Sequence, residues 1–381
     1  MRLGPDFVRN ISNNPGELPV QASRWHRWHL DAPLLFMLVI LSGFGLAVLY
    51  SASSMEAGRV IRQLASLGVA FLAMLVVAQL QVKTLRQLAP LGYLVGMLLL
   101  VLVAFFGVGA KGAQRWLSVF GFFQFQPSEI MKIVAPLAVG WYLADRVLPP
   151  RPGFLLVGVV IALLPCVLIA MQPDLGTSLL IASSGLFTLW LAGIRWRYLF
   201  VAAIAIAASA WPAWHYLLHD YQKRRILTLF NPETDKLGAG WNIIQSKTAI
   251  GSGGWEGKGW LNGTQSHLDF LPESHTDFII AVLAEEFGFY GVLLLVMLYA
   301  AIIIRCASIS INAKDTFSRL VSGSITLTFA VYVLVNMGMV AGLLPVVGVP
   351  LPLVSYGGTA LVTMMVSFGV VMAIATEQRA I

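Results

Sequence analysis

Residues 241–280 read WNIIQSKTAIGSGGWEGKGWLNGTQSHLDFLPESHTDFII, a polar, glycine-rich stretch in a chain made otherwise of hydrophobic runs and short hinges. The last acid of this stretch, Asp277, lies where an apolar run resumes. The hydrophobic runs on both sides predict that the stretch lies at a membrane surface. If the protein performs chemistry, we expect the reacting groups to meet there.

The composition of the whole chain is that of a membrane protein. Of its 381 residues 58% are hydrophobic and only 11% are charged, whereas soluble domains carry about 25% charged residues. The apolar runs are unbroken rather than alternating, which excludes an outer-membrane barrel. The net charge of +7 comes from basic residues scattered singly among short loops, which indicates topology signals rather than nucleic-acid binding. We therefore predict an all-α polytopic integral membrane protein.

The hydrophobic runs predict about ten transmembrane helices, because a bilayer core needs about 20 apolar residues per helix. A long extracytoplasmic loop, residues 219–276, separates helices seven and eight. Its length and its tryptophans favour a folded segment at the interface. The expected spans are residues 32–53, 60–79, 88–107, 127–145, 154–171, 175–193, 198–218, 277–304, 319–343 and 355–376.

The distribution of basic residues predicts the orientation. Fourteen lysines and arginines lie in the termini and in the loops on their side, and four lie in the short loops opposite. The positive-inside rule then makes both termini cytoplasmic. Residues 1–30 are expected to form a cytoplasmic tail with no cleavable signal, residues 31–376 the transmembrane domain, and residues 377–381 a short cytoplasmic tail. Cys166 and Cys306 both fall inside apolar runs, so a disulfide framework is not expected.

Asp277 ends the run Ser274-His275-Thr276-Asp277 before a long apolar helix. The run matches a capping box, so one interpretation is that Asp277 only caps this helix and complements its dipole. The other is a carboxylate held at the membrane face as a general base.

Glu129 and Lys132 lie three residues apart inside the fourth expected span. This spacing puts both charges on one helix face, and charges within a span face a bundle interior or a water-filled cavity. They form either a structural ion pair or a cavity site in which Lys132 binds phosphate. Arg115, just outside this helix, is either an interfacial anchor or a fork for a phosphate group. Asp174 is expected to cap the sixth span rather than to join the cavity.

Glu285 and Glu286 follow Asp277 by eight and nine residues, which turns them away from it along the helix and favours structural contacts. Residues 253–258 depart from the Walker spacing, and no H-E-x-x-H accompanies His215 and His219. These failures set aside ATP chemistry and zinc hydrolysis.

Five segments together resemble the SEDS family of bacterial cell-wall synthesis. They are KGAQRW, QPSEIMK, QPDLGTS, the loop from GWNIIQSK to ESHTDFI, and NMGMVAGLLPVVGVPLPLVSYGG. The form GTQSHLDFLPESHTDF resembles the elongation-type members more closely than the division-type members. The resemblance covers about residues 30 to 376 and leaves out the first thirty residues.

The resemblance implies a ten-span fold in the bacterial inner membrane and peptidoglycan glycosyltransferase activity on lipid II and the nascent glycan strand. It implies a single-span partner, a class B penicillin-binding protein, together with other elongation-complex membrane proteins. The essential aspartate of the family falls on Asp277, and the polar positions of its cavity fall on Arg115, Glu129 and Lys132.

These roles agree with the chemistry of joining two lipid-linked sugars at the outer membrane surface. Asp277 would act as base on the acceptor hydroxyl, Arg115 and Lys132 would stabilise the undecaprenyl diphosphate leaving group, and Glu129 would position Lys132. Lys247 is a weaker candidate for the same anion. A divalent cation such as Mg²⁺ or Mn²⁺ would also neutralise the leaving group, although no ligand cluster in the sequence specifies one. Two alternatives stay open, a flippase for lipid-linked precursors and a scaffold for the transpeptidase.

Overall fold

The computed structural model describes residues 29–110, 113–119, 123–218, 220–235, 238–264 and 274–377. The predicted cytoplasmic tails lie almost entirely outside these residues. In the described part, ten long hydrophobic helices occupy the ten expected ranges. They are α3 (Ala32–Ala52), α4 (Ala57–Ala78), α5 (Val82–Phe106), α6 (Pro127–Ala144), α7 (Pro152–Ala170), α8 (Leu175–Leu191), α9 (Trp196–Pro212), α13 (Ile279–Ile311), α14 (Thr316–Val340) and α15 (Gly358–Glu377).

Eight of these helices are long and apolar enough to cross a bilayer by length and composition alone. The two others are α8, which has only 17 residues, and α6, which carries Glu129 and Lys132 in its first two turns. Both helices are surrounded by other helices, since α8 packs on α7 and α14, and α6 packs on α5 and α8. Neighbouring helices therefore shield the polar groups of α6 from lipid, as a charged segment in a membrane requires.

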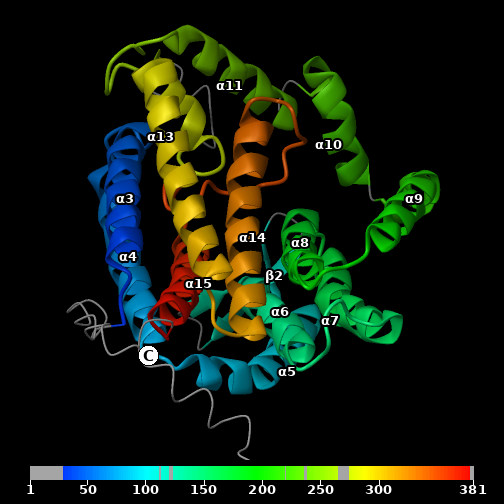
Figure 1. The fold of residues 1–381 in the computed structure, drawn as a ribbon. Helices are drawn as coiled ribbons and strands as arrows, with labels where there is room; N and C mark the ends of the chain where they lie inside the picture. The colour runs from blue at the N-terminus through cyan, green and yellow to red at the C-terminus, as the bar shows by residue number, and fades with distance from the viewer. Residues whose placement is uncertain are drawn as a thin grey trace, which may run out of the picture.

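The segments outside the bundle contain a small β-sheet, which the sequence did not predict, and further helices. A small antiparallel sheet of β1 (Val108–Ala110), β2 (Ala113–Val119) and β3 (Phe123–Phe125) precedes α6. The long loop holds α10 (Asp220–Phe230), a 3₁₀ turn η2 (Pro232–Thr234) and α11 (Ala239–Gly253). Figure 1 shows α11 lying across the ends of α13 and α14, which agrees with the expected folded loop.

One helix stands apart from the bundle. Helix α9 continues into a π-helical turn, η1 (Ala213–Leu217), and none of the residues of α9 is buried. In Figure 1 it projects to the side of the other helices. The chain therefore reaches α10 through a segment that makes few contacts with the bundle.

Polar contacts join the start of α3 to α13 and to the end of α15. The carboxylate of Asp31, at the start of α3, accepts hydrogen bonds from Arg305 Nε at 3.0 Å and Arg305 Nη2 at 2.5 Å. His29 contacts the hydroxyl of Thr376, near the end of α15, at 3.3 Å. The first and last helices thus begin and end on the same side, as an even number of spans requires.

The helices pack closely where glycines face a neighbouring backbone. A Cβ added to Gly45 in α3 would lie 2.7 Å from the carbonyl oxygen of Leu353 and 2.8 Å from Val354 Cα. Gly43, in the same helix, has no atom within 4 Å of its virtual Cβ. Gly45 is therefore a position at which the fold needs the absence of a side chain, and Gly43 is not.

This difference gives a paired test. We expect Gly45→Val to lower the melting temperature of the detergent-solubilised protein by several degrees or to remove folded protein, because main-chain atoms cannot move aside cheaply. Gly43→Val makes the same chemical change on a face that meets no protein atom, and it should melt within about one degree of the wild type. Equal losses in the two variants would contradict the packing described here.

Candidate active site

A cavity of about 430 Å³ lies among α6, α8, α10, α14 and the segment before α15. Its charged lining residues come from four separate parts of the chain, so it exists only in the folded bundle. We call it the central cavity. The lining residues used below are Arg115, Gln126, Glu129, Lys132, Pro173, Asp174, Gln222, Arg225, Tyr332 and Gly348.

Glu129 and Lys132 form an ion pair in the wall of the central cavity. Lys132 Nζ donates to Glu129 Oε1 at 2.6 Å, and the two side chains are only 14% and 11% exposed, respectively. The ammonium also lies 5.3 Å from the centre of the Tyr332 ring, an arrangement typical of a cation–π contact. Pro127 is the first residue of α6, a position whose main-chain N–H has no partner within a helix, so proline loses no hydrogen bond there. The three-residue spacing of Glu129 and Lys132 then places the two charges side by side on one face of α6. The structure confirms the ion pair and places it in the wall of a cavity, and phosphate binding by Lys132 stays a prediction.

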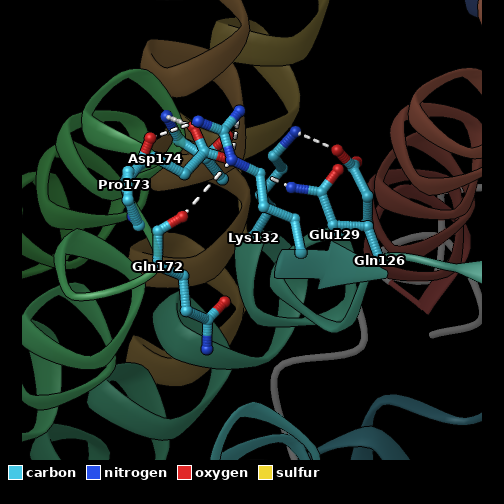
Figure 2. A network of polar contacts seen from close by, with 8 residues as sticks. Gln126, Glu129, Lys132, Gln172, Pro173 and Asp174 are labelled. Atoms are coloured by element: carbon cyan, nitrogen blue, oxygen red, sulfur yellow. Dashed lines mark hydrogen bonds and ion pairs between the residues drawn. The ribbon is translucent and has the colours of Figure 1, made fainter. Parts of the chain in front are cut away.

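Arg115, in β2, holds the turn before α8. Its Nε donates to the carbonyl oxygen of Gln172 at 3.3 Å, and its Nη2 donates to that of Pro173. Its Nη1 lies 3.8 Å from Asp174 Oδ2. In Figure 2, Gln172, Pro173 and Asp174 lie beside the Glu129–Lys132 pair. The guanidinium is one-third exposed, so part of its surface faces the central cavity.

Asp174 has two roles in this arrangement. Its Oδ1 accepts from the Thr177 main-chain N at 3.3 Å, which confirms the predicted cap of α8. Its Oδ2 accepts from Gln126 Nε2 at 2.9 Å, and Asp174 also lines the central cavity. A carboxylate here partly offsets the charge of Arg115 and fixes the guanidinium beside the cavity.

Asp277 lies two residues before α13, which starts after Phe278. The capping-box prediction is wrong, because Phe278 is the N-cap residue and the hydroxyl of Ser274 donates instead to the Ala52 carbonyl. The Asp277 main-chain oxygen accepts from Asn336 Nδ2 at 2.8 Å, and the same amide group donates to the Val349 oxygen at 2.7 Å. Asn336 thus ties the start of α13 to the segment that lines the cavity.

The carboxylate of Asp277 lies against this lining segment. A Cβ built on Gly348 would lie 3.5 Å from Asp277 Oδ2, and Gly348 lines the central cavity. The positive φ of Gly348, 76°, is a conformation that glycine adopts without strain. Arg115 and Lys132 therefore line the central cavity, whereas Asp277 is not among its lining residues and lies against Gly348 in its wall.

The remaining acids and the weaker lysine lie elsewhere. Glu285 pairs with Lys258 and Glu286 accepts from the hydroxyl of Ser51, which confirms structural contacts for both glutamates. Lys247 lies on α11 with its side chain against Gly342, at the end of α14, and it is not among the residues that line the central cavity. The structure therefore does not bring Lys247 to Arg115 and Lys132.

Sequence reasoning missed Arg225 and Gln222, which line the cavity from α10. Of the basic residues in the long loop, the sequence indicated only Lys247 as a site candidate. The pattern that could have identified them is helical, since Leu218, Gln222 and Ile226 recur at four-residue intervals and Arg225 lies on the same side.

A second, largely apolar depression of about 480 Å³ opens between α4, α6 and α15. Gln126 and Glu129 line both this groove and the central cavity. Among the described residues, no group of three or more His, Cys, Asp or Glu side chains gathers that could hold a metal ion. Bound divalent metal therefore stays a prediction from substrate chemistry.

Comparison with known proteins gives a consistent set of relatives. The family model of cell cycle proteins of the FtsW, RodA and SpoVE type matches residues 32–380. The chain is 48% identical to the peptidoglycan glycosyltransferase MrdB of Escherichia coli over 95% of this chain and 97% of that protein. It is 36% identical to a probable peptidoglycan glycosyltransferase FtsW of Trichlorobacter lovleyi, covering 90% of this chain and 92% of the relative.

Solved structures agree in fold. A chain from a study of how a peptidoglycan synthase complex coordinates polymerization and crosslinking superposes with a TM-score of 0.81 at 29% identity. That match covers 92% of this chain and 98% of the other. The crystal structure of the rod shape determining protein RodA of Thermus thermophilus gives a TM-score of 0.69 at 28% identity, over 92% and 97% of the two chains.

The ion pair in the cavity wall gives a stability test. Removing one partner leaves a buried charge without its counterion, which costs about 3–5 kcal/mol in protein interiors, whereas replacing both partners by neutral groups costs less. We expect the single variants Glu129→Gln and Lys132→Met each to melt at a lower temperature than the double variant. A double variant that loses the sum of both single effects would contradict a coupled buried pair.

Proposed function

The chain belongs to the FtsW, RodA and SpoVE family of cell cycle proteins and is a peptidoglycan glycosyltransferase, and we propose that it polymerises lipid II at the central cavity. In this proposal the product is a β-1,4-linked glycan strand made during cell elongation. The family match covers nearly the whole transmembrane chain, and the curated relatives match along almost their full length. The proposal concerns which residues perform the reaction and how.

One observation carries the proposal. Arg115 and Lys132 converge on one cavity, and Gly348 in another wall of that cavity lies against the carboxylate of Asp277. Glycosyl transfer from a lipid diphosphate needs cations and a carboxylate at separate positions. Negative charge develops on the leaving group, and the acceptor hydroxyl must lose a proton. Cations on one wall and a carboxylate near another satisfy both requirements.

The reaction is a single displacement at the anomeric carbon of the donor sugar. The 4-hydroxyl oxygen of the acceptor forms the new bond, and the bond from the anomeric carbon to the diphosphate oxygen breaks. The hydroxyl proton passes to Asp277, and the electron pair of the broken bond leaves with undecaprenyl diphosphate. One inversion converts the α-linked donor into a β-linked product. Holding both lipid-linked sugars at the membrane surface supplies the proximity that such a step requires.

The cations would share the diphosphate. Lys132 contributes a compact charge, held by Glu129, and Arg115 contributes a planar fork fixed by the turn before α8. Arg225 adds a third cation from α10, on the loop side of the cavity. Several cations around the diphosphate stabilise the negative charge that develops on the leaving group.

A membrane partner would place this reaction within cell-wall assembly. The protein is a membrane protein, and we propose the bacterial inner membrane with both termini cytoplasmic, in agreement with the excess of basic residues on that side. A related solved chain comes from a peptidoglycan synthase complex that coordinates polymerization with crosslinking. We propose a class B penicillin-binding protein as partner, because the glycan strand made at the outer face then lies within reach of a transpeptidase.

The assignment of Asp277 predicts a loss of chemistry without a loss of fold. With labelled lipid II and blocked transpeptidation, we expect Asp277→Asn to reduce polymer by at least about 100-fold, because the amide cannot accept the hydroxyl proton. The same preparation should keep the melting temperature of the wild type. Translocation of lipid without polymer in the wild type would instead establish a flippase, and inactivity in both assays would leave a scaffold.

The cation assignments predict a graded series. We expect Lys132→Ala to abolish polymer while the protein still inserts and binds its partner, because the diphosphate loses its most buried counter-charge. Arg225→Met should reduce the rate of polymerisation by about tenfold or more. Arg224→Met, one residue earlier on the same helix and outside the cavity lining, is the matched control and should stay within about twofold of wild type. Near-normal polymer from Lys132→Ala would remove Lys132 from the site.

A further inference from the structure

Helix α13 is broken near its outer end. The sequence predicts one continuous apolar helix, but Gly288 has φ 62° and ψ −160°, so the helix is divided at this residue. The outer piece, residues 279–287, is called here the half-helix, and Asp277 lies two residues before it. Such a break leaves main-chain groups without their helical partners, and these groups need other partners in a membrane protein.

Residues 254–264, called here the strap, supply these partners. The strap follows α11 and folds against the break, so that donors and acceptors on both sides of Gly288 are used. Four main-chain hydrogen bonds join strap and helix: Lys258 N to Glu285 O at 3.0 Å, Gly259 N to Glu286 O at 2.9 Å, Phe289 N to Gly254 O at 2.9 Å, and Tyr290 N to Trp255 O at 3.2 Å. The strap thus replaces the hydrogen bonds that the break removes.

The two backbones meet without side chains between them. A Cβ on Gly257, whose φ is 80°, would lie 2.1 Å from the Glu286 carbonyl oxygen, and one on Gly288 would lie 2.4 Å from Gly257 N. Neither position tolerates a larger residue without displacing main chain. The fit of strap and helix is therefore specific.

A buried carboxylate anchors the strap. Glu285 is fully buried, and its Oε1 accepts from Lys258 Nζ at 2.7 Å, from Thr264 N at 2.9 Å and from Thr264 Oγ1 at 3.0 Å. Lys258 comes from the middle of the strap and Thr264 from its end, so one carboxylate holds both. A charged hydrogen bond to a group with no solvent access is stronger than one at a surface.

The other end of the half-helix carries the reacting carboxylate. Residues 279–286 are all buried, so the half-helix is packed along its length. Just before the half-helix, Asn336 donates to the main-chain oxygen of Asp277, and the Ser355 hydroxyl donates to that of Thr276. Glu285 lies eight residues behind Asp277, about 12 Å along a helix that rises about 1.5 Å per residue. A shift of the anchored end is therefore transmitted to Asp277 through a short rigid element.

We propose that Lys258 is a positioning residue for the glycosyl transfer, and that its bond to Glu285 sets the place of Asp277 through the half-helix. The inference rests on the proposed role of Asp277 as base. A displacement of about 1 Å at a reacting group can reduce rate about 100-fold, so an anchor remote from the cavity can influence the reaction without touching substrate.

The test combines kinetics with a positional probe. We expect Lys258→Met to lower kcat by about tenfold or more while KM for lipid II stays within about twofold, since the diphosphate cations are unchanged. Lys258→Arg, which keeps the charge and the donors, should recover most of the activity. Lys314→Met, on an exposed lysine at the opposite end of α13, is the matched control and should behave as wild type.

The positional probe does not depend on activity. In an Asp277→Cys protein the two native cysteines are buried, so a water-soluble thiol reagent reports the exposure of position 277, and labelling of Cys166 or Cys306 reports unfolding. Lys258→Met in this background should change the labelling rate at position 277 severalfold, with the native cysteines still protected. Equal labelling rates with and without Lys258→Met would overturn the proposal. A changed labelling rate with unaltered kcat in the Lys258→Met enzyme would support the structural link and count against Asp277 as base.

Discussion

The ion pair between Glu129 and Lys132 is the constraint on which the arrangement depends. A charged residue inside a bilayer needs either water or a counter-charge, so α6 must be enclosed by other helices and must face a polar cavity. The structure meets both needs, because α6 is packed among its neighbours and the pair lines the central cavity. Lys132 is paired with Glu129 but also lines the central cavity, so it is accessible to an anionic ligand that enters from the membrane surface. In the proposed mechanism, stability and chemistry depend on the same two residues.

The second constraint is the position of the carboxylate. Asp277 belongs to none of the helices that carry the cations, and its place depends on contacts from α14, from the segment before α15 and from the long loop. Helix α13 is broken so that a short rigid piece, rather than a whole span, presents this residue. The long loop therefore has a structural explanation: its strap supplies the hydrogen bonds that the break in α13 requires.

Much of this could be predicted from the sequence, and the failures have physical causes. Unbroken apolar runs predicted all ten helices, and the spacing of Glu129 and Lys132 predicted their contact. The capping box at Ser274 failed because α13 begins only at Ile279, and the Ser274 hydroxyl donates to the distant Ala52 carbonyl. The break at Gly288 and the strap across it could not be predicted, since they depend on two distant segments meeting. Arg225 was missed because a basic residue in a long loop resembles a topology signal until its helix is placed.

The central claim is that the diphosphate of the lipid-linked donor binds between Lys132 and Arg115, with the acceptor sugar beside Asp277. The most direct measurement is an experimental structure of the Asp277→Ala protein, in complex with its partner and saturated with lipid II. We expect density for the diphosphate in the central cavity, in contact with Lys132, and a sugar hydroxyl near residue 277. A diphosphate bound outside that cavity, for example along the apolar groove between α4 and α15, would contradict it.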